Sequence, residues 1–320
     1  MKILFIGYSN VLKKRILPIL DRLDFIDSLS IAKSGNRSWD NIFELTSKPI
    51  ELFNNYKEAI YNSNSSIAYI TTTNDSHFIL AKETLKAGMH TIIDKPATIL
   101  LQETKELLQI ARDNKLLLSE STVYTYHPQF NSLMEVMAKN NANPKLLTAH
   151  FSFPPMDKNN FRYRKNLGGG AFLDTSPYAV SLGRYFFNSI PDRVFYIKNE
   201  IMDDGLEISY SLLLKYSNGR ALIGHFGFNT EYINRLNILG DKICIDVDRI
   251  FTIPDLVTNQ IKVKVENQSQ EITALKGNTF ELYLKVVGNA IKHNEFERLY
   301  ADMSMDAHSR NMILCSQNNQ

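Results

Sequence analysis

Short apolar runs alternate with segments of helical periodicity along the first third of the chain. The runs end in glycine or polar residues, as buried strands of a parallel sheet do. Between them, apolar residues recur three or four positions apart, which gives a helix one buried face. Predicted strands cover 3–6, 29–32, 67–70, 91–93 and 116–118, and predicted helices cover 11–23, 78–87 and 100–114. This alternation predicts βαβ units and an α/β domain with a parallel sheet over residues 1–121.

The second part of the chain is richer in strand-like segments. Predicted helices cover 128–140, 177–187, about 278–289 and 303–315, and predicted strands cover 145–153, 194–198, 206–216, 221–229, 232–239, 242–247 and 260–265. Asn218-Gly219 falls between two of these strands and is a strong signal for a tight hairpin. Together the segments predict a second domain of mixed helix and sheet over residues 122–320.

Composition and charge narrow the class of protein. The chain has 320 residues, of which 44% are hydrophobic and 22% charged, and its net charge is +2. These values are ordinary for a globular protein, and so small a charge neither attracts nucleic acid nor binds an anionic membrane. No apolar window approaches the length of a bilayer span. We therefore expect no nucleic-acid partner and no membrane association.

The cysteines and histidines argue against disulfides and metals. Cys244 and Cys315 form neither a disulfide framework nor a closely spaced ligand pair. The seven histidines show no paired spacing of the kind that binds zinc. No metal site is expected, and the reducing cytoplasm is the expected location.

The strand over 91–93 runs directly into Asp94, Lys95 and Pro96. A parallel strand delivers such a group to the carboxyl edge of its sheet, where ligands bind. Lys95 is therefore a candidate for the active site. The alternative is an ordinary turn, since proline ends ladder pairing wherever it stands.

Three glycines at 168–170 precede a second candidate group. They allow the backbone to pass close to another part of the structure, although a flexible loop is the other interpretation. Asp174 and Tyr178 follow, four positions apart, where residues 175–177 are expected to begin a helix. One helical turn places both side chains on the same face.

The turn after the first strand keeps only the first glycine of the dinucleotide fingerprint G-x-G-x-x-G. Backbone N–H groups at the start of the next helix can still hold a pyrophosphate, and the basic residues 13–15 add positive charge. The predicted cofactor-binding residues of this turn are Gly7, Tyr8, Ser9, Asn10 and Val11.

The segment after the second strand bears on the choice of cofactor. NAD-binding sites usually place an acid there to hold the ribose hydroxyls, but this chain has no acid before Asp40. Ser34, Arg37 and Ser38 instead offer a guanidinium fork and hydroxyl groups to a 2′-phosphate. NADP(H) is therefore predicted in preference to NAD(H), with a solvated loop as the alternative.

Small polar side chains follow the third strand, just before a helix. Thr71, Thr72, Asn74 and His77 can line the pyrophosphate and the nicotinamide ribose. Asparagine at such a position is also a good helix cap, and the two roles are compatible. A structural role for the histidine is the alternative.

Taken together, these motifs resemble the glucose-fructose oxidoreductase, inositol dehydrogenase and rhizopine catabolism (Gfo/Idh/MocA) family. The most specific motif is Asp94-Lys95-Pro96, which stands where the family usually has Glu-Lys-Pro, and the resemblance runs from Lys2 to about Phe187. It implies a Rossmann domain followed by a domain with a large, open, mostly antiparallel sheet. That sheet often packs against another subunit, so a homodimer or homotetramer is expected.

The resemblance implies hydride transfer between a nicotinamide and a sugar, polyol or related carbonyl, with Asp94, Lys95 and Pro96 next to the cofactor and a cis Lys-Pro bond. Tyr178 stands where many members have a histidine, a trait of the branch that reduces keto groups of nucleotide-linked deoxyhexoses. Residues 248–254 look like a strand segment of that branch.

A mechanism follows as a hypothesis. NADPH delivers hydride to a sugar ketone, Tyr178 protonates the developing alkoxide, and Lys95 stabilises its charge. A helix N-terminus is expected to act on Tyr178 together with Lys95. Asp174 would bind a neighbouring sugar hydroxyl. Tyr124, Arg162, Tyr163 and Arg164 are candidates for contact with the substrate and its diphosphate, with a solvated loop as the alternative for the last three.

Other functional classes remain open. One is a non-catalytic, NADP-binding regulator of the same fold, and another is a polyol, inositol or dihydrodiol-type dehydrogenase. The chain lacks Tyr-x-x-x-Lys, G-x-S-x-G and H-E-x-x-H, which argues against short-chain reductases, serine hydrolases and zinc proteases.

Overall fold

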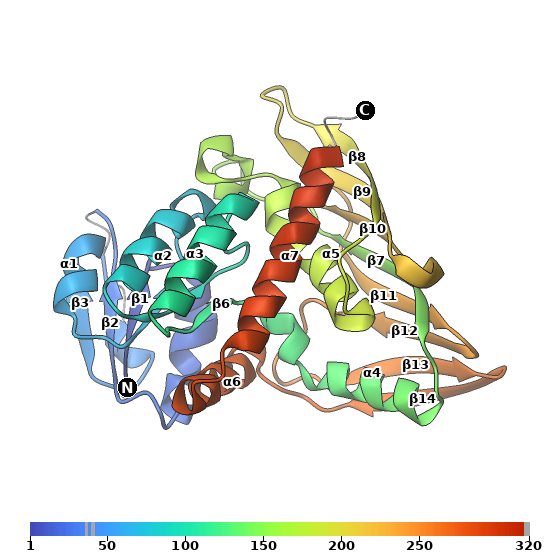
Figure 1. Ribbon diagram of the computed structural model, residues 1–320, viewed down its shortest axis with the longest axis horizontal. Coiled ribbons are helices and arrows are strands. Elements are labelled where there is room, and N and C mark those ends of the chain that lie inside the picture. The colour runs from blue at the N-terminus through green and yellow to red at the C-terminus, as the bar shows by residue number, and fades with distance from the viewer. Residues whose placement is uncertain (36–37, 40–41, 317–320) are drawn as a thin grey trace. The chain divides into compact units, whose positions relative to one another are not determined.

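The computed structural model describes residues 1–35, 38–39 and 42–316 (Figure 1). The chain divides into two compact units. The first unit contains Met1–Ser121 and Phe280–Ser304, and the second contains Thr122–Thr279 and the residues from Met305 onward. The division drawn from the sequence placed residues 280–304 in the second domain, whereas the structure packs them with the first unit. No helix in the described ranges combines the length and apolar character needed to cross a membrane.

A six-stranded parallel sheet, with the order β3-β2-β1-β4-β5-β6, forms the centre of the first unit. Its strands are β1 (Lys2–Ile6), β2 (Ser28–Ala32), β3 (Ile50–Phe53), β4 (Ile67–Ile70), β5 (His90–Ile93) and β6 (Leu118–Glu120), and its flanking helices are α1 (Tyr56–Asn62), α2 (His77–Lys86) and α3 (Leu101–Asp113). The predicted parallel α/β domain is confirmed. The sequence analysis missed α1 and the edge strand β3, which is only partly buried.

The segment after β1 is less regular than predicted. A π-helical turn (Leu12–Ile16) and a 3₁₀ segment (Leu17–Arg22) replace the single helix expected over 11–23. Pro18 has no backbone N–H to donate to the carbonyl group of Lys14, so α-helical hydrogen bonding cannot continue through it. Local backbone chemistry thus overrides the apolar periodicity here.

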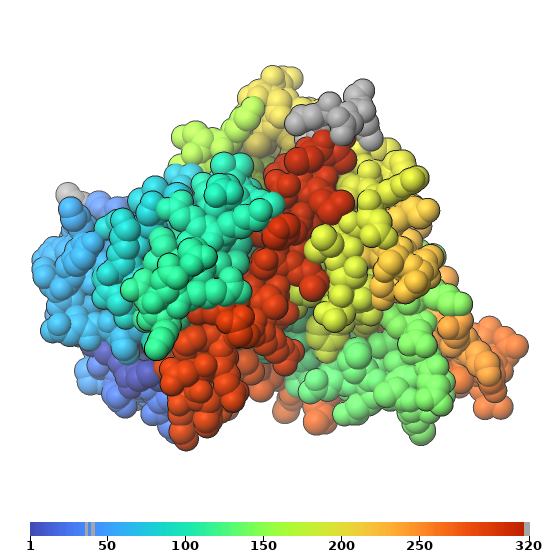
Figure 2. All heavy atoms as spheres, viewed as in Figure 1, coloured from blue at the N-terminus to red at the C-terminus, as the bar shows by residue number. Residues whose placement is uncertain are grey.

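Helix α6 (Thr279–His293) and the start of α7 (Glu297–Ser316) complete the first unit. The Tyr283 hydroxyl donates to Ser119 Oγ at 2.9 Å, and the Tyr300 hydroxyl donates to the Leu116 carbonyl oxygen. Such contacts join distant parts of the chain, so local periodicity gave no sign of them. Figure 2 shows the outer side of α7 at the molecular surface.

An eight-stranded, mostly antiparallel sheet dominates the second unit, with the order β14-β13-β12-β11-β7-β10-β9-β8. Only β7 and β10 pair in parallel. The strands are β7 (Pro144–Ser152), β8 (Arg193–Ile201), β9 (Glu207–Lys215), β10 (Ala221–Gly227), β11 (Ile233–Gly240), β12 (Ile243–Asp248), β13 (Asn259–Val265) and β14 (Gln268–Ala274). The predicted open sheet and the Asn218-Gly219 hairpin are confirmed, with positive φ at both turn residues. The polar edge strand β14 was missed.

The two faces of this sheet differ in composition. Helix α5 (Ala171–Phe187) packs on β7, β9 and β10, and together with α4 (Pro128–Lys139) it covers an apolar core on one face (Figure 1). On the opposite face, Phe195, Ile197, Ile223 and Leu239 are between 40% and 60% exposed. The uncovered face therefore carries apolar side chains that water disfavours.

Helix α5 starts earlier than predicted. It begins at Ala171, so Pro177 lies inside it and not in its first turn. Because proline has no N–H, the Leu173 carbonyl oxygen cannot receive the usual bond from residue 177. Residues 249–254 also differ from the strand segment suggested by the family resemblance, since β12 ends at Asp248 and the chain then turns.

Candidate active site

The turn after β1 brings two backbones into close contact. Gly7 has a φ of +105°, and a Cβ atom built on it would lie 2.9 Å from both the carbonyl carbon and the carbonyl oxygen of Thr71. The Thr71 hydroxyl donates to the Gly7 carbonyl oxygen at 2.8 Å. Only glycine meets both demands. The structure therefore joins the ends of β1 and β4 at the carboxyl edge of the parallel sheet.

The remaining residues of this turn differ in exposure. Ser9 Oγ accepts a hydrogen bond from the N–H of Leu12 at 3.1 Å, so this side chain caps the first helical turn. Tyr8 and Val11 are half-buried, and Asn10 is exposed. The exposed edge of the turn can still offer backbone N–H groups to a phosphate.

A cluster of aromatic rings and lysines lies beside this turn, and sequence reasoning missed it as a unit. The Lys33 ammonium sits 4.1 Å from the centroid of the Trp39 ring, and the Lys13 ammonium sits 4.9 Å from that of Tyr8. The two rings are 5.3 Å apart. Lys33 is only 4% exposed, and in the described part of the chain no carboxylate pairs with it. A buried ammonium is stabilised by a neighbouring anion, which marks Lys33 as a candidate anion-binding group.

The predicted residues for the 2′-phosphate lie next to Lys33. Ser34 and Ser38 are exposed, and the Tyr56 hydroxyl donates to Ser34 Oγ at 3.4 Å. Arg37 lies outside the described residues. Lys33 directly follows the buried residues of β2, and this position could have marked it as a site residue. The prediction from the sequence favoured the hydroxyl and guanidinium groups that come after it.

The polar residues after β4 bond chiefly to the protein itself. The Ser76 hydroxyl lies 2.7 Å from Thr72 Oγ1, and Asn74 is buried. His77 is also buried, with Nδ1 2.9 Å from the Pro96 carbonyl oxygen and Nε2 3.2 Å from that of Thr72. Both neighbours are acceptors and a neutral ring has one N–H, so the ring donates to one loop and packs against the other. The structural alternative therefore describes His77 better than the predicted cofactor contact does.

The Asp94-Lys95-Pro96 segment leaves β5 at the same sheet edge. The Lys95–Pro96 peptide bond is cis, as the resemblance implied. Asp94 Oδ1 accepts hydrogen bonds from the Lys95 N–H at 2.9 Å and from Ser121 Oγ at 3.2 Å. Glu120, at the end of β6, accepts the N–H of Ala97 at 2.8 Å. Both carboxylates thus fix the backbone around Lys95.

In the second unit, the three glycines pack against the loop that precedes them. A Cβ atom on Gly169 would lie between 2.6 and 2.8 Å from the carbonyl oxygens of Phe161, Arg162 and Arg164. The N–H of Gly170 donates to the Arg162 carbonyl oxygen at 2.8 Å. The predicted close approach is therefore between two backbone segments of this chain, and the flexible-loop alternative does not hold.

This packing places Arg162 against the start of α5. Its Nε donates to Asp174 Oδ2 at 2.7 Å, and the Asp174 side chain is only 8% exposed. The sequence analysis assigned these residues to separate substrate groups, whereas the structure pairs them. Tyr163 accepts the N–H of Met156 at 3.1 Å, and Arg164 is exposed.

Tyr178 lies on α5, one turn beyond Asp174. Its ring centroid is 5.4 Å from that of Tyr124, 5.0 Å from Phe151 and 5.1 Å from Phe251. Since α5 begins at Ala171, Tyr178 lies beyond the first turn, where the field of the helix N-terminus has fallen off. The expectation that this terminus acts on Tyr178 is therefore wrong.

The first turn of α5 is instead held by the sheet. The Glu207 carboxylate, on β9, accepts the N–H of Phe172, and burial outweighs this bond and the charge of Lys198, so the pKa of Glu207 is raised. The Thr175 hydroxyl donates to the Ala171 carbonyl oxygen at 2.6 Å and lies 3.1 Å from the Tyr210 hydroxyl. Sheet and helix are thus joined by buried polar contacts close to Asp174.

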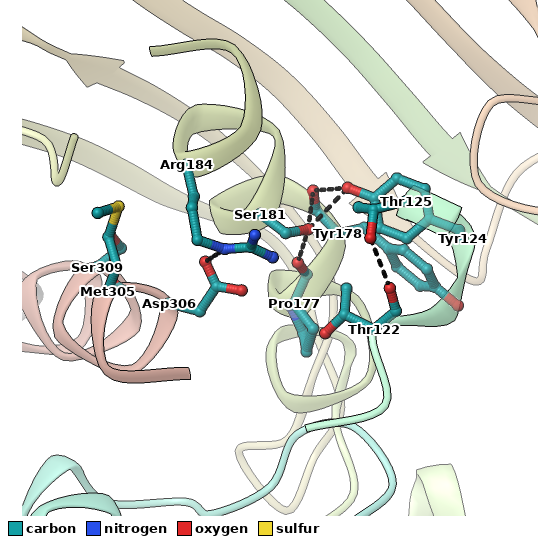
Figure 3. A network of polar contacts seen from close by, with 10 residues as sticks. All are labelled: Thr122, Tyr124, Thr125, Pro177, Tyr178, Ser181, Arg184, Met305, Asp306 and Ser309. Carbon is teal, nitrogen blue, oxygen red and sulfur yellow. Dashed lines mark hydrogen bonds and ion pairs between the residues drawn. The ribbon is translucent and has the colours of Figure 1, made fainter. Parts of the chain in front are cut away.

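Tyr124 was predicted to contact the substrate, but it is only 3% exposed. Its hydroxyl lies 2.7 Å from Ser181 Oγ and donates to the Tyr178 carbonyl oxygen at 3.1 Å (Figure 3). Farther along α5, Arg184 Nε donates to Asp306 on α7 at 2.9 Å, in a pair that is almost fully buried. Tyr124 therefore belongs to the support of α5.

Two models of one family match the chain. An oxidoreductase family with an NAD-binding Rossmann fold matches residues 1–122, and the GFO/IDH/MocA C-terminal domain matches residues 142–246. The chain belongs to the Gfo/Idh/MocA family. The first match ends one residue past Ser121, the second lies within the second unit, and together they cover most of the chain.

Several members of the family are similar over nearly the whole chain. The dTDP-3,4-didehydro-2,6-dideoxy-alpha-D-glucose 3-reductase of Actinomadura kijaniata is 22% identical, over 94% of this chain and 90% of the relative. A 3-ketoreductase structure from that organism, in complex with NADP and TDP-benzene, has a TM-score of 0.89 at 20% identity, covering 98% and 97% of the two chains. An aldose-aldose oxidoreductase from Caulobacter crescentus, complexed with glycerol, has a TM-score of 0.87 at 15% identity, covering 100% and 98%. At these identities the solved structures establish the fold.

This Gfo/Idh/MocA protein is thus an NAD(P)-binding oxidoreductase. Its own residues fit such a cofactor, because the Gly7 turn lies at the carboxyl edge of the parallel sheet and the first unit also holds the buried Lys33 ammonium at the end of β2. Among the described residues, no group of three or more His, Cys, Asp or Glu side chains is arranged to hold a metal.

Replacing Glu207 by glutamine should change the pH dependence of stability. The raised pKa means that the folded protein holds this proton more tightly than the unfolded chain does. Wild-type stability should therefore fall as the pH rises from the ordinary glutamate value of 4.5 through the folded pKa. Glu207→Gln keeps an acceptor for Phe172, so its free energy of unfolding should fall less over this window, as urea titrations at several pH values would show.

Glu271→Gln, on the exposed edge strand β14, provides the control. It should follow the wild-type pH dependence. Identical pH dependence for Glu207→Gln and the wild type would contradict the burial of an ionisable carboxyl at the start of α5.

Proposed function

We propose that this protein is an NADP(H)-dependent ketoreductase acting on a keto group of a nucleotide-linked sugar. The observation that carries the proposal is the placement of Tyr178. This residue lies on α5, at a position where family members often have histidine, and its phenol ring is held among three aromatic rings from other elements. The similarity to a dTDP-sugar 3-reductase over most of the chain supports the same substrate class. Lys95, at the carboxyl edge of the parallel sheet, supplies the cation.

NADPH, when bound, supplies the hydride for the carbonyl carbon. The Tyr178 hydroxyl gives its proton to the carbonyl oxygen, which becomes the product hydroxyl, and the tyrosinate takes a proton back from water. The Lys95 ammonium stabilises the negative charge that develops on the same oxygen. Each group has one role, and the hydride and the proton account for the two hydrogens added.

Asp174 and the preceding loop complete the proposed substrate site. Asp174 accepts a hydrogen bond from a neighbouring sugar hydroxyl, and its bond to Arg162 fixes the orientation of the carboxylate. Arg164 is exposed and carries the charge that a substrate diphosphate requires. Tyr163, bonded to the backbone at Met156, shapes the loop between them.

Lys95→Met and Tyr178→Phe should each lower turnover by about 100- to 10,000-fold, since each removes a group that acts on the developing alkoxide. NADPH affinity should change little. The measurement is NADPH oxidation with a panel of dTDP-linked keto-deoxyhexoses, together with a fluorescence titration of NADPH binding. Lys105→Met, an exposed lysine on α3, is the control for loss of charge.

Unchanged turnover in both variants would refute the assignment. NADPH binding without oxidation by any keto sugar would favour a non-catalytic regulator. Reduction of NADP⁺ by polyols, inositols or dihydrodiols alone would favour a dehydrogenase of that class.

The preference for NADP(H) over NAD(H) is part of the proposal. Lys33 supports it, since its buried ammonium contacts the Trp39 ring and, among the described residues, no carboxylate. A 2′-phosphate would place a negative charge beside this ammonium, with Ser34 and Ser38 as further donors.

Lys33→Met should weaken NADPH binding by about 10- to 100-fold, the value of one charge-assisted hydrogen bond, and leave NADH binding nearly unchanged. Lys14→Met removes an equal charge from an exposed position on the segment after β1 and should affect both cofactors little. Dissociation constants for both cofactors provide the measurement. Equal weakening for NADPH and NADH in Lys33→Met would contradict a 2′-phosphate contact.

We further propose that the uncovered face of the eight-stranded sheet packs on a second copy of the chain, in a homodimer or homotetramer. Phe195 and Ile223 flank Leu213 in one row across β8, β9 and β10, and Ile197 lies in the next row. Beyond them, Arg235 on β11 pairs with Asp246 on β12 at 3.2 Å. An apolar patch beside charges of both signs suits self-complementary contact about a two-fold axis.

The double change Ile197→Glu and Ile223→Glu should lower the mass in solution toward that of the monomer, since it places carboxylates in the proposed interface. Sedimentation equilibrium measures the mass. Ile79→Glu, which alters a 59% exposed isoleucine on α2, should leave the mass unchanged. A wild-type protein that sediments as a monomer would overturn this part of the proposal.

A further inference from the structure

The 3₁₀ segment Val123–Tyr126 places Tyr124 under helix α5. The Tyr124 ring lies 5.4 Å from the Tyr178 ring, 5.4 Å from Phe130 and 5.3 Å from Phe251, measured between centroids. Each contact has edge-to-face geometry, which aromatic pairs favour. Tyr124 therefore forms one wall of the site that holds the Tyr178 ring.

The Tyr124 hydroxyl bonds to the turn of α5 that carries Tyr178. Ser181 Oγ donates its proton to the Pro177 carbonyl oxygen at 2.5 Å, so the single proton of the Tyr124 hydroxyl, 2.7 Å from Ser181 Oγ, is shared between that oxygen and the Tyr178 carbonyl oxygen. The same Tyr124 hydroxyl lies 3.1 Å from the Tyr178 carbonyl oxygen. Burial raises the pKa of Tyr124 far above that of a free phenol, which keeps this hydroxyl a donor at every physiological pH. Figure 3 shows these contacts converging on α5.

This support is placed where the helix is weakest. Pro177 cannot donate to the Leu173 carbonyl oxygen, so the turn that precedes Tyr178 has lost one backbone hydrogen bond. The Ser181 hydroxyl bonds to the Pro177 carbonyl oxygen, and the Tyr124 hydroxyl bonds to the Tyr178 carbonyl oxygen. Side-chain contacts thus restrain the turn that the proline loosens.

The opposite wall of the site is held in a similar way. Phe251 follows β12 in a loop whose backbone is bonded to side chains on other elements. Its N–H donates to Asn234 Oδ1 at 3.0 Å, and Gln129 Nε2 donates to the Ile250 carbonyl oxygen at 3.0 Å. Two of the rings that contact Tyr178 are therefore held by hydrogen bonds to other elements, and Tyr124 in addition bonds to the Tyr178 backbone.

We propose that Tyr124 is a positioning residue that fixes the orientation of the Tyr178 phenol. This inference rests on the proposed function, in which Tyr178 gives the proton. Loss of the Tyr124 hydroxyl would let the turn at Pro177 relax and would move the phenol relative to the reacting oxygen. Tyr124 itself touches neither substrate nor cofactor in this role.

Tyr124→Phe should lower kcat about tenfold, because a small displacement of a reacting group is costly, while KM for the keto sugar stays nearly constant. In a Tyr178→Phe background, the same change should have no further effect on the residual rate. Equal losses in both backgrounds would indicate a general structural role and overturn the proposal.

Tyr216→Phe is the matched control. Tyr216 is also a buried tyrosine of the second unit, but its hydroxyl has no hydrogen-bond partner among the described residues. Its loss should leave kcat unchanged. If Tyr124→Phe does not fold, Ser181→Ala provides the alternative test. This change removes the hydroxyl that accepts from Tyr124 without altering any ring, and it should also lower kcat.

A measurement without substrate separates this inference from the proposed function. Fluorotyrosine at position 178 should give one narrow ¹⁹F resonance in the otherwise wild-type protein, and Tyr124→Phe should broaden or shift it, whereas Tyr216→Phe should not. An unchanged resonance in Tyr124→Phe would refute the positioning role, whatever the reaction. Full turnover in Tyr178→Phe would refute the proposed function instead.

Discussion

The attachment of α5 to the eight-stranded sheet is the constraint on which the second unit depends. At its start, Gly169 fits beneath three carbonyl oxygens that would reject any side chain. The buried pair of Arg184 and Asp306 ties the helix to α7. Small residues and satisfied polar groups thus hold the helix close enough to fix Asp174 and Tyr178.

In the first unit, the residues of the candidate site are positioned mainly by the parallel sheet and its loops. Its parallel strands end together at one edge, so backbone pairing makes Gly7, Thr71 and Asp94 neighbours, and the Thr71 hydroxyl adds a bond to the Gly7 carbonyl oxygen. The loop containing Lys95 is then fixed by backbone bonds to Asp94 and Glu120. Loops held by a rigid sheet suit a cofactor site, since they place backbone donors accurately. Asp174 and Tyr178 in the second unit rely on packed side chains instead.

What the sequence predicted well follows from local chemistry. A buried parallel strand that ends in Asp94-Lys95-Pro96 can release Lys95 only at the carboxyl edge of the sheet, and Asn218-Gly219 suits the positive φ angles of its turn. The start of α5 was misplaced because Pro177 reads as a first-turn residue. Its true position depends on contacts with Glu207 and Tyr210, which no local pattern shows. Tertiary contacts, not propensity, decide such boundaries.

The difference between local patterns and tertiary contacts also explains why the contacts of three polar residues were not predicted from the sequence. Arg162 and Tyr124 resemble substrate contacts in the sequence because cations and phenols often bind sugars, but their partners lie far away along the chain, at Asp174 and Ser181. Lys33 was passed over because its burial depends on Trp39. In each case the polar side chain found a partner within the fold, which is what burial demands.

A phenol surrounded by aromatic rings also bears on the direction of the reaction. Tyr124, Phe151 and Phe251 bring no charge to the Tyr178 ring. In the proposed function the phenol gives a proton to the carbonyl oxygen, whereas oxidation of an alcohol needs a base at the same place. A histidine at this position would serve both directions near neutral pH. Tyrosine at this position is therefore the proton donor that the proposed reduction requires.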